Sequence, residues 1–256
     1  MRTLIFSLAL LPLLVFASTA GAHEDLVPYE LNGKIVTGGH DDVFASNTIE
    51  RRVFGFDFGE EPSDPYFIGD PGFNNGAFAI GAFPNNGLLP ANQTLRFSVL
   101  SNLQYWDGTG AVTFSPAPIG VELGLNRGAF TVYTSGTGQT GTAPTIGSTG
   151  ASGRLHVHLG SLLATTSDGT DPAAPNAPDG IYALSFKLSM PGSGVADSDS
   201  LWLVFNNGLS EVQHDSAVEF IEQTLVPEPS AWMLMTTSLG ALAVTGWRKS
   251  RVARGA

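Results

Sequence analysis

Two histidines separated by a single residue stand out as side chains that can do chemistry together. The sequence Leu155-His156-Val157-His158-Leu159 alternates apolar and imidazole side chains, which is the pattern of a half-buried β-strand. Residues two apart on a strand project from the same face, with Cα atoms about 6.5 to 7 Å apart. Both imidazoles can therefore bind one ion, and such a pair is half of a zinc or copper site.

Further ligands for this pair are expected from two distant histidines. His40 follows two glycines, which allow a tight backbone, and Asp41 or Asp42 can act as a ligand or fix an imidazole tautomer. His214 lies on a predicted helix. The sequence thus predicts a zinc site formed by His40, His156, His158 and His214. The alternative interpretation is that all four are ordinary packing or surface histidines.

The elements that must position these residues are mostly strands. Seven short runs of β-type residues alternate with glycine- and proline-rich turns, which favours an antiparallel sandwich or barrel. These runs are 52–58, 94–100, 119–123, 129–133, 154–159, 181–189 and 201–205. The run 181–189 alternates so regularly that one buried and one solvated face are expected. The stretches 134–153 and 165–179 are predicted to be loops, and no linker divides the domain.

One helix is predicted to pack on the sheet near the C-terminal end of the body. Ser210 can cap it, and Gln213 occupies the capping-box position. His214, Val218 and Ile221 recur at spacings of four and three, which places them on one stripe. His214 is therefore expected to face the sheet.

Composition excludes several classes of function. The chain has 256 residues and no cysteine, so thiolate metal sites, cysteine nucleophiles and disulfides are excluded. There is no Gly-x-Ser-x-Gly elbow to support serine-hydrolase chemistry. Without the two terminal signals described next, the chain has seven basic and 22 acidic residues. Such a surface repels phosphate backbones, so no nucleic-acid partner is expected.

The N-terminus has the three parts of a secretory signal peptide. Arg2 is followed by an apolar run over 4–16 and then by small residues ending in Ala20-Gly21-Ala22. The apolar run is shorter than the roughly 20 residues of a spanning helix. We expect signal peptidase to remove residues 1–22, which leaves an extracytoplasmic domain over 23–226.

The C-terminus carries a complementary signal over 227–256. Pro227-Glu228-Pro229 precedes an apolar stretch over 231–247 that is long enough to cross a membrane. Basic residues follow it, and the positive-inside rule keeps them in the cytoplasm. They are Arg248, Lys249, Arg251 and Arg254.

This tail resembles the PEP-CTERM sorting signal of Gram-negative bacteria that make exopolysaccharide. The resemblance rests on Pro227, Glu228 and Pro229, the apolar helix and the basic end, and it covers about the last 30 residues. It implies cleavage near the triplet by an exosortase. The protein would be transiently anchored in the membrane and would then reside in the periplasm, on the outer surface or in the extracellular matrix.

The body is similar, in short motifs, to a PEP-CTERM family repressed by the zinc regulator Zur. The likeness rests on the segments 39–43, 154–158 and 201–210 and on His214. Membership implies expression under zinc starvation, and hence zinc scavenging or a role that replaces a zinc-demanding protein.

Three functions remain open from the sequence. The first is non-enzymatic extracytoplasmic zinc binding. The second is a structural or exopolysaccharide-associated matrix protein whose histidines are incidental. The third is a metal-dependent hydrolase, which would also need a carboxylate base and an open coordination position.

Overall fold

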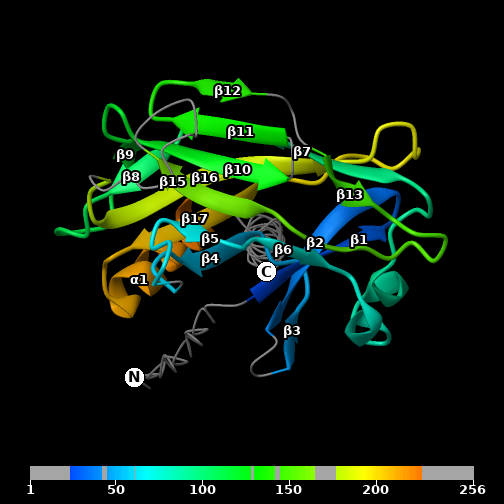
Figure 1. The fold of residues 1–256 in the computed structure, drawn as a ribbon. Helices are drawn as coiled ribbons and strands as arrows, with labels where there is room; N and C mark the ends of the chain where they lie inside the picture. Colours follow the sequence, from blue (N-terminus) through cyan, green and yellow to red (C-terminus); the bar gives the residue numbers. More distant parts are fainter. Residues whose placement is uncertain are drawn as a thin grey trace, which may run out of the picture.

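The structure is a computed structural model, and it describes residues 24–41, 45–60, 62–127, 130–141, 145–164 and 177–226. The described part is mostly β with one α-helix, which confirms the predicted class (Figure 1). The expected signal peptide and the sorting tail, with Pro227, Glu228, Pro229 and the apolar stretch 231–247, lie outside the described residues. No helix among the described residues has the length and apolar character needed to span a bilayer.

Three sheets make up the body. Sheet A has the order β14 (His156–His158), β6 (Gly72–Asn74), β1 (Glu24–Leu31), β2 (Lys34–Asp41) and β3 (Ser46–Thr48). Sheet B has the order β13 (Thr145–Ser148), β7 (Thr94–Val99), β16 (Gly180–Ser189), β17 (Leu201–Asn207) and β4 (Val53–Asp57), and β8 (Gln104–Trp106) and β9 (Ser115–Pro116) extend it. Sheet C has the order β12 (Gln139–Gly141), β11 (Phe130–Ser135), β10 (Glu122–Arg127), β15 (Gly160–Ala164) and β5 (Phe67–Ile68).

Among the named strands that the structure describes, the pairing is antiparallel except at two places. β1 pairs with β6, and β4 pairs with β17, in parallel. The two members of each parallel pair are far apart in the sequence, and parallel neighbours need such long connections. The prediction of a purely antiparallel arrangement is therefore wrong at these two pairs.

One apolar core joins the three sheets. Its fully buried side chains include Phe73 from sheet A, Phe97 and Phe186 from sheet B, and Leu123 and Leu163 from sheet C. Figure 1 shows β11 and β12 of sheet C at the top of the view, above β17 and β4 of sheet B. A core of this size stabilises the domain without disulfides, as the absence of cysteine requires.

The β1–β2 hairpin begins the described chain. Asn32 and Gly33 both have positive φ, at 53° and 78°, and they form the two-residue turn between Leu31 and Lys34. An Asn-Gly pair is the preferred sequence for such a turn. Two 3-10 helices, η1 (Ala77–Ala79) and η2 (Pro84–Gly87), follow β6, and Ala79 and Phe83 pack on Val27 and Tyr29 of β1.

The helix α1 (Glu211–Thr224) follows β17 and packs on β4 and β17 (Figure 1). Ser210 and Gln213 form the predicted capping box. Ala217, Val218 and Ile221 are buried against Ile181 and Ala183 of β16.

This helix explains why one prediction about β16 is wrong. The strand is buried on both faces from Gly180 to Phe186, and only Lys187 and Ser189 are partly exposed. Part of the face expected to be solvated is instead buried with the helix, because Ile181 and Ala183 belong to the apolar cluster that contains Ala217, Val218 and Ile221 of α1.

Two other boundaries differ from the predictions. The stretch 134–153 contains β12 and β13, so it is not a simple loop. The strand predicted over 119–123 begins only at Glu122, because Ile119 is fully exposed and Gly120 has φ of 86°.

Candidate metal centre

The strand β14 presents His156 and His158 as the sequence predicts. Both imidazoles are exposed, while Leu155 and Leu159 on either side are buried. β14 is an edge strand of sheet A and pairs only with β6 along its length. The two histidines therefore stand side by side on an accessible sheet face.

The two rings approach each other through equivalent nitrogens. Nε2 of His156 lies 3.1 Å from Nε2 of His158. Nδ1 of His158 lies 3.1 Å from Oδ1 of Asp70. The carboxylate only accepts, so a neutral His158 has its proton on Nδ1 and presents a bare Nε2. His156 then donates the one proton that lies between the two rings.

A metal ion can take the place of that proton. Two nitrogens that bind zinc at about 2.0 to 2.1 Å in a tetrahedral site lie about 3.3 Å apart, which is close to the distance observed here. A carboxylate on the other nitrogen of a ligating histidine fixes its tautomer and raises its basicity. Asp70 has this position relative to His158.

A second carboxylate, that of Asp25 on β1, also lies beside the ring of His158. Gly72 of β6 lies opposite His158 in the ladder. A Cβ atom at Gly72 would overlap Oδ1 of Asp25 and would lie 3.0 Å from Cε1 of His158. The glycine thus leaves the space in which a carboxylate and an imidazole meet. Asn74 holds the other oxygen, donating to Oδ2 of Asp25 at 2.9 Å.

Asp25, Asp70 and His158 form a group whose ligand atoms all lie within 4.8 Å of one another. Asp25 is buried, Asp70 is half-buried and His158 is exposed. The group therefore opens to solvent on the side of the histidine pair and is supported by buried polar atoms on the other side. Together with His156, it contains nitrogen and oxygen donors that suit zinc.

His40 lies on the same sheet face but not in this group. In the β1–β2 ladder it is directly opposite Asp25. Its ring is buried and stacks on Phe78, with centroids 3.8 Å apart, and its Nδ1 contacts Oδ1 of Asn47 at 2.8 Å. Asn47 belongs to β3, on the side away from β14, so this contact turns Nδ1 away from the histidine pair.

His214 occupies a different part of the molecule, on sheet B. It faces the sheet as predicted, with 1% of its surface exposed. Nε2 lies 3.2 Å from the carbonyl oxygen of Val204, and Nδ1 lies 3.3 Å from Oδ1 of Asp57. The structure therefore does not bring the four predicted histidines together. It brings together only His156 and His158.

Burial and the neighbouring negative charge shift the pKa of His214 in opposite directions. Loss of solvent lowers the pKa of its imidazole, but the hydrogen-bonding capacity and the negative charge of Asp57 outweigh this effect. The net pKa of His214 is raised above its ordinary value. The imidazolium form is thus stabilised relative to that of a free histidine when no other cation is near Asp57.

Neither carboxylate beside the histidine pair is predictable from the local sequence. Asp70 lies 88 residues before His158, and Asp25 lies 133 residues before it, and no local spacing links them. Asp41, which was considered as a partner of His40, follows it directly on β2. Successive residues on a strand point to opposite faces.

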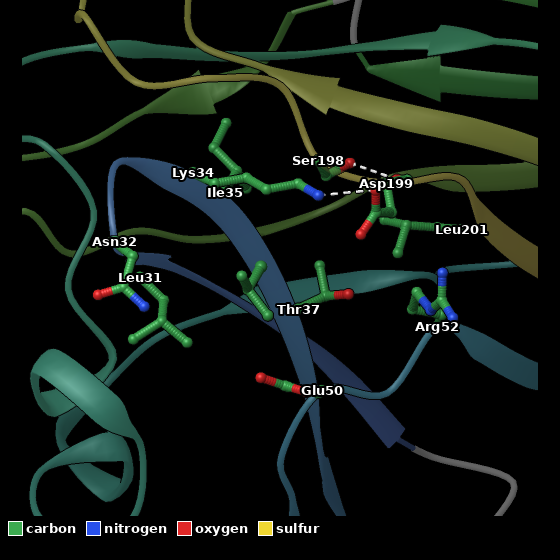
Figure 2. A pocket seen from close by; sticks show the side chains of 11 residues that line it. Leu31, Asn32, Lys34, Ile35, Thr37, Glu50, Arg52, Ser198, Asp199 and Leu201 are labelled. Atoms are coloured by element: carbon green, nitrogen blue, oxygen red, sulfur yellow. Dashed lines mark hydrogen bonds and ion pairs between the residues drawn. The ribbon is translucent and has the colours of Figure 1, made fainter. Parts of the chain in front are cut away.

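A cavity of about 310 Å³ lies elsewhere, beside β2 and the segment before β17. Figure 2 shows Lys34 extended toward Asp199, and their charged groups are 2.7 Å apart. Glu50 and Arg52 also line the cavity, so acidic and basic side chains balance there. None of its lining residues is a histidine, and the cavity is separate from the candidate metal centre.

The chain was compared with models of known protein families, with curated proteins and with solved structures, and none of them matches it.

Proposed function

We propose that this protein is an exported, non-enzymatic metal-binding protein that holds a zinc ion at His156 and His158. The single observation that carries the proposal is the 3.1 Å separation of the two Nε2 atoms, combined with the contact of Nδ1 of His158 with Asp70. A pair of packing histidines needs neither feature. Export by the signal peptide and sorting by the PEP-CTERM tail belong to the same proposal.

The donor set supports binding more than catalysis. His156 and His158 supply two nitrogens, and Asp25 is close enough to the ring of His158 to supply an oxygen. Asp70 is occupied in orienting His158, and Asn74 holds Asp25. Each carboxylate thus has a positioning contact, and neither is left as the base that a hydrolase would use on a bound water.

The acidic body favours the same function. The excess of acidic over basic residues attracts divalent cations to the surface. An exported protein meets metal ions outside the cytoplasm, and a layered β-sandwich with an exposed edge strand offers its ligands directly to that medium. Zinc-limited growth, which the likeness to the Zur-repressed family implies, would then be the condition of use.

The test is zinc binding by the purified chain, without a polyhistidine tag, measured by titration calorimetry. We expect one zinc ion to depend on the histidine pair, and the double variant His156→Ala/His158→Ala to weaken that binding at least 100-fold. The folded state should survive, because exposed positions usually change stability by less than about 0.5 kcal/mol. Far-UV circular dichroism checks this point.

Asp70→Asn separates an oriented metal site from two adjacent imidazoles. Loss of the carboxylate beside a ligating histidine typically costs about 10- to 100-fold in affinity, and we expect that range here. Asp64→Asn is the matched control, because Asp64 is half-buried like Asp70 but lies before β5, outside the ligand group, whereas Asp70 follows β5. Equal affinity of the double-histidine variant and the original chain would contradict the proposal and favour the matrix-protein alternative.

A further inference from the structure

A second cluster of ligand-type side chains lies at the start of α1, on residues that the histidine-pair site does not use. Asp57 ends β4, and Glu211 and His214 are on the first turns of α1. Their ligand atoms all lie within 4.8 Å of one another. His214 is buried, Asp57 is half-buried and Glu211 is exposed, so the cluster runs from the interior to the surface.

The hydrogen bond between His214 and the carbonyl of Val204 determines which ring nitrogen has a free lone pair on the side of the cluster. The carbonyl of Val204 can only accept, so Nε2 of His214 donates to it. In the neutral ring Nδ1 is then a bare acceptor, and it is a buried atom with no hydrogen-bond partner. It lies 3.3 Å from Oδ1 of Asp57, which is within ion-pair distance when the ring is protonated.

The cluster therefore gathers acceptors around one point. In the neutral ring, the bare imidazole nitrogen and the two carboxylates repel one another unless a cation lies between them, and either a proton on Nδ1 or a metal ion can take that place. The positive end of the α1 dipole weakly opposes a cation there, but two carboxylates outweigh a partial charge.

The local fold prepares these groups. Glu211 and His214 are three residues apart, so they share one helix face, and Glu-x-x-His is a recurring ligand pair on helices. Asn206 donates to Oδ1 of Asp57 at 2.7 Å and fixes that carboxylate. Gly55 makes room for the ring, because a Cβ there would lie 3.0 Å from Cε1 and Nε2 of His214.

We infer that Asp57, Glu211 and His214 form a second metal site, which takes a divalent transition-metal ion through Nδ1 of His214 and the two carboxylates. The carbonyl of Val204 sets the tautomer, as a backbone acceptor commonly does for a ligating histidine. The 3.3 Å separation of Nδ1 and Oδ1 is that of two ligands on one tetrahedral ion. The inference shares no residue with the histidine pair.

The experiment is Co²⁺ titration of the full chain carrying His156→Ala and His158→Ala, purified in mild detergent without a polyhistidine tag. We expect one equivalent of Co²⁺ to bind with visible absorption bands. Adding Glu211→Gln should weaken that binding at least tenfold. Adding Glu219→Gln, an exposed carboxylate two turns further along α1, should leave it unchanged.

Glu211→Gln is chosen because Glu211 is exposed and the variant should fold, whereas loss of His214 risks the packing of α1. Circular dichroism of each variant provides the check on folding. The inference is overturned if the folded double-histidine variant binds no Co²⁺ in a saturable way, or if Glu211→Gln and Glu219→Gln bind it equally. Either result leaves the zinc test on the original chain unaffected, so the two sites succeed or fail separately.

Discussion

His158 and His214 are positioned by similar neighbours, but one ring is exposed and the other is buried. At each one, a glycine on the neighbouring strand leaves room for an imidazole: Gly72 for His158 and Gly55 for His214. At each one, an acceptor fixes one ring nitrogen: the Asp70 carboxylate for His158 and the Val204 carbonyl for His214. The first site is on an exposed edge strand, however, and the second is beneath a helix.

Because the two rings differ in exposure, removing them should have different effects on metal binding and on stability. The ring of His158 is exposed, so its removal should cost little packing and affect mainly the metal ion that we propose it binds. The ring of His214 is buried between α1 and β4, so it contributes to the packing of the helix whether or not a metal is bound. One residue type thus has a mainly functional role at one site and a partly structural role at the other.

The largest expected effect comes from truncating the two rings separately. His214→Ala removes a buried ring and the imidazole that faces the Asp57 carboxylate, and we expect it to lower the free energy of unfolding by about 3 kcal/mol. His158→Ala should lower it by less than about 0.5 kcal/mol. Urea unfolding in EDTA, which removes any stabilisation by bound metal, makes the measurement. Similar values for the two variants would refute the comparison.

A smaller effect is expected from filling the space beside each ring. In Gly55→Ala the new methyl group presses on a buried ring that cannot move far, and we expect a loss of about 1 to 2 kcal/mol in unfolding free energy. In Gly72→Ala the methyl group displaces the Asp25 carboxylate, and we expect zinc affinity to fall about tenfold with a smaller loss of stability. Unfolding and zinc titration of both variants test this crossed pattern. Gly59→Ala cannot serve as a control for these variants, because Gly59 has a φ of 90°, at which alanine would strain the backbone.

The smallest effect is on the pH dependence of stability. The folded-state pKa of His214 is raised, so its contribution is fully present below the ordinary histidine pKa of about 6.5 and is lost as the pH rises through the folded-state pKa. In EDTA, the stability advantage of the original chain over Asp57→Asn should therefore shrink between pH 6 and pH 9. An advantage that stays constant or grows over this range would show that Asp57 does not stabilise the imidazolium.

Several features of the fold could be predicted because their causes are local. The capping box of Ser210 and Gln213 and the buried stripe of α1 follow from spacing alone, and the structure confirms both. The alternation around His156 and His158 also gave the correct faces. The β1–β2 hairpin was missed although its signal was present, since Asn32-Gly33 between apolar residues is a strong hairpin sequence.

Other features could not be read from local patterns because they depend on what packs against them. Nothing in the sequence of β16 shows that α1 covers its second face. The partners of the histidines come from other strands and connections: Asp25 and Asp70 for one site, Asp57 for the other. Their side chains meet only because sheet A joins β14 to β1 through β6, and sheet B joins β4 to β17.

The sequence by itself determined that this is a mostly β body with one capped helix and that His156 and His158 share a strand face, because period and spacing act between neighbours in the chain. Tertiary structure decided which histidines belong together. His214 faces its sheet as predicted, but that sheet is not the one carrying β14, so the ring meets Asp57 and Glu211 instead of the histidine pair. Strand order is set by packing among distant segments, and no periodicity within one segment encodes it.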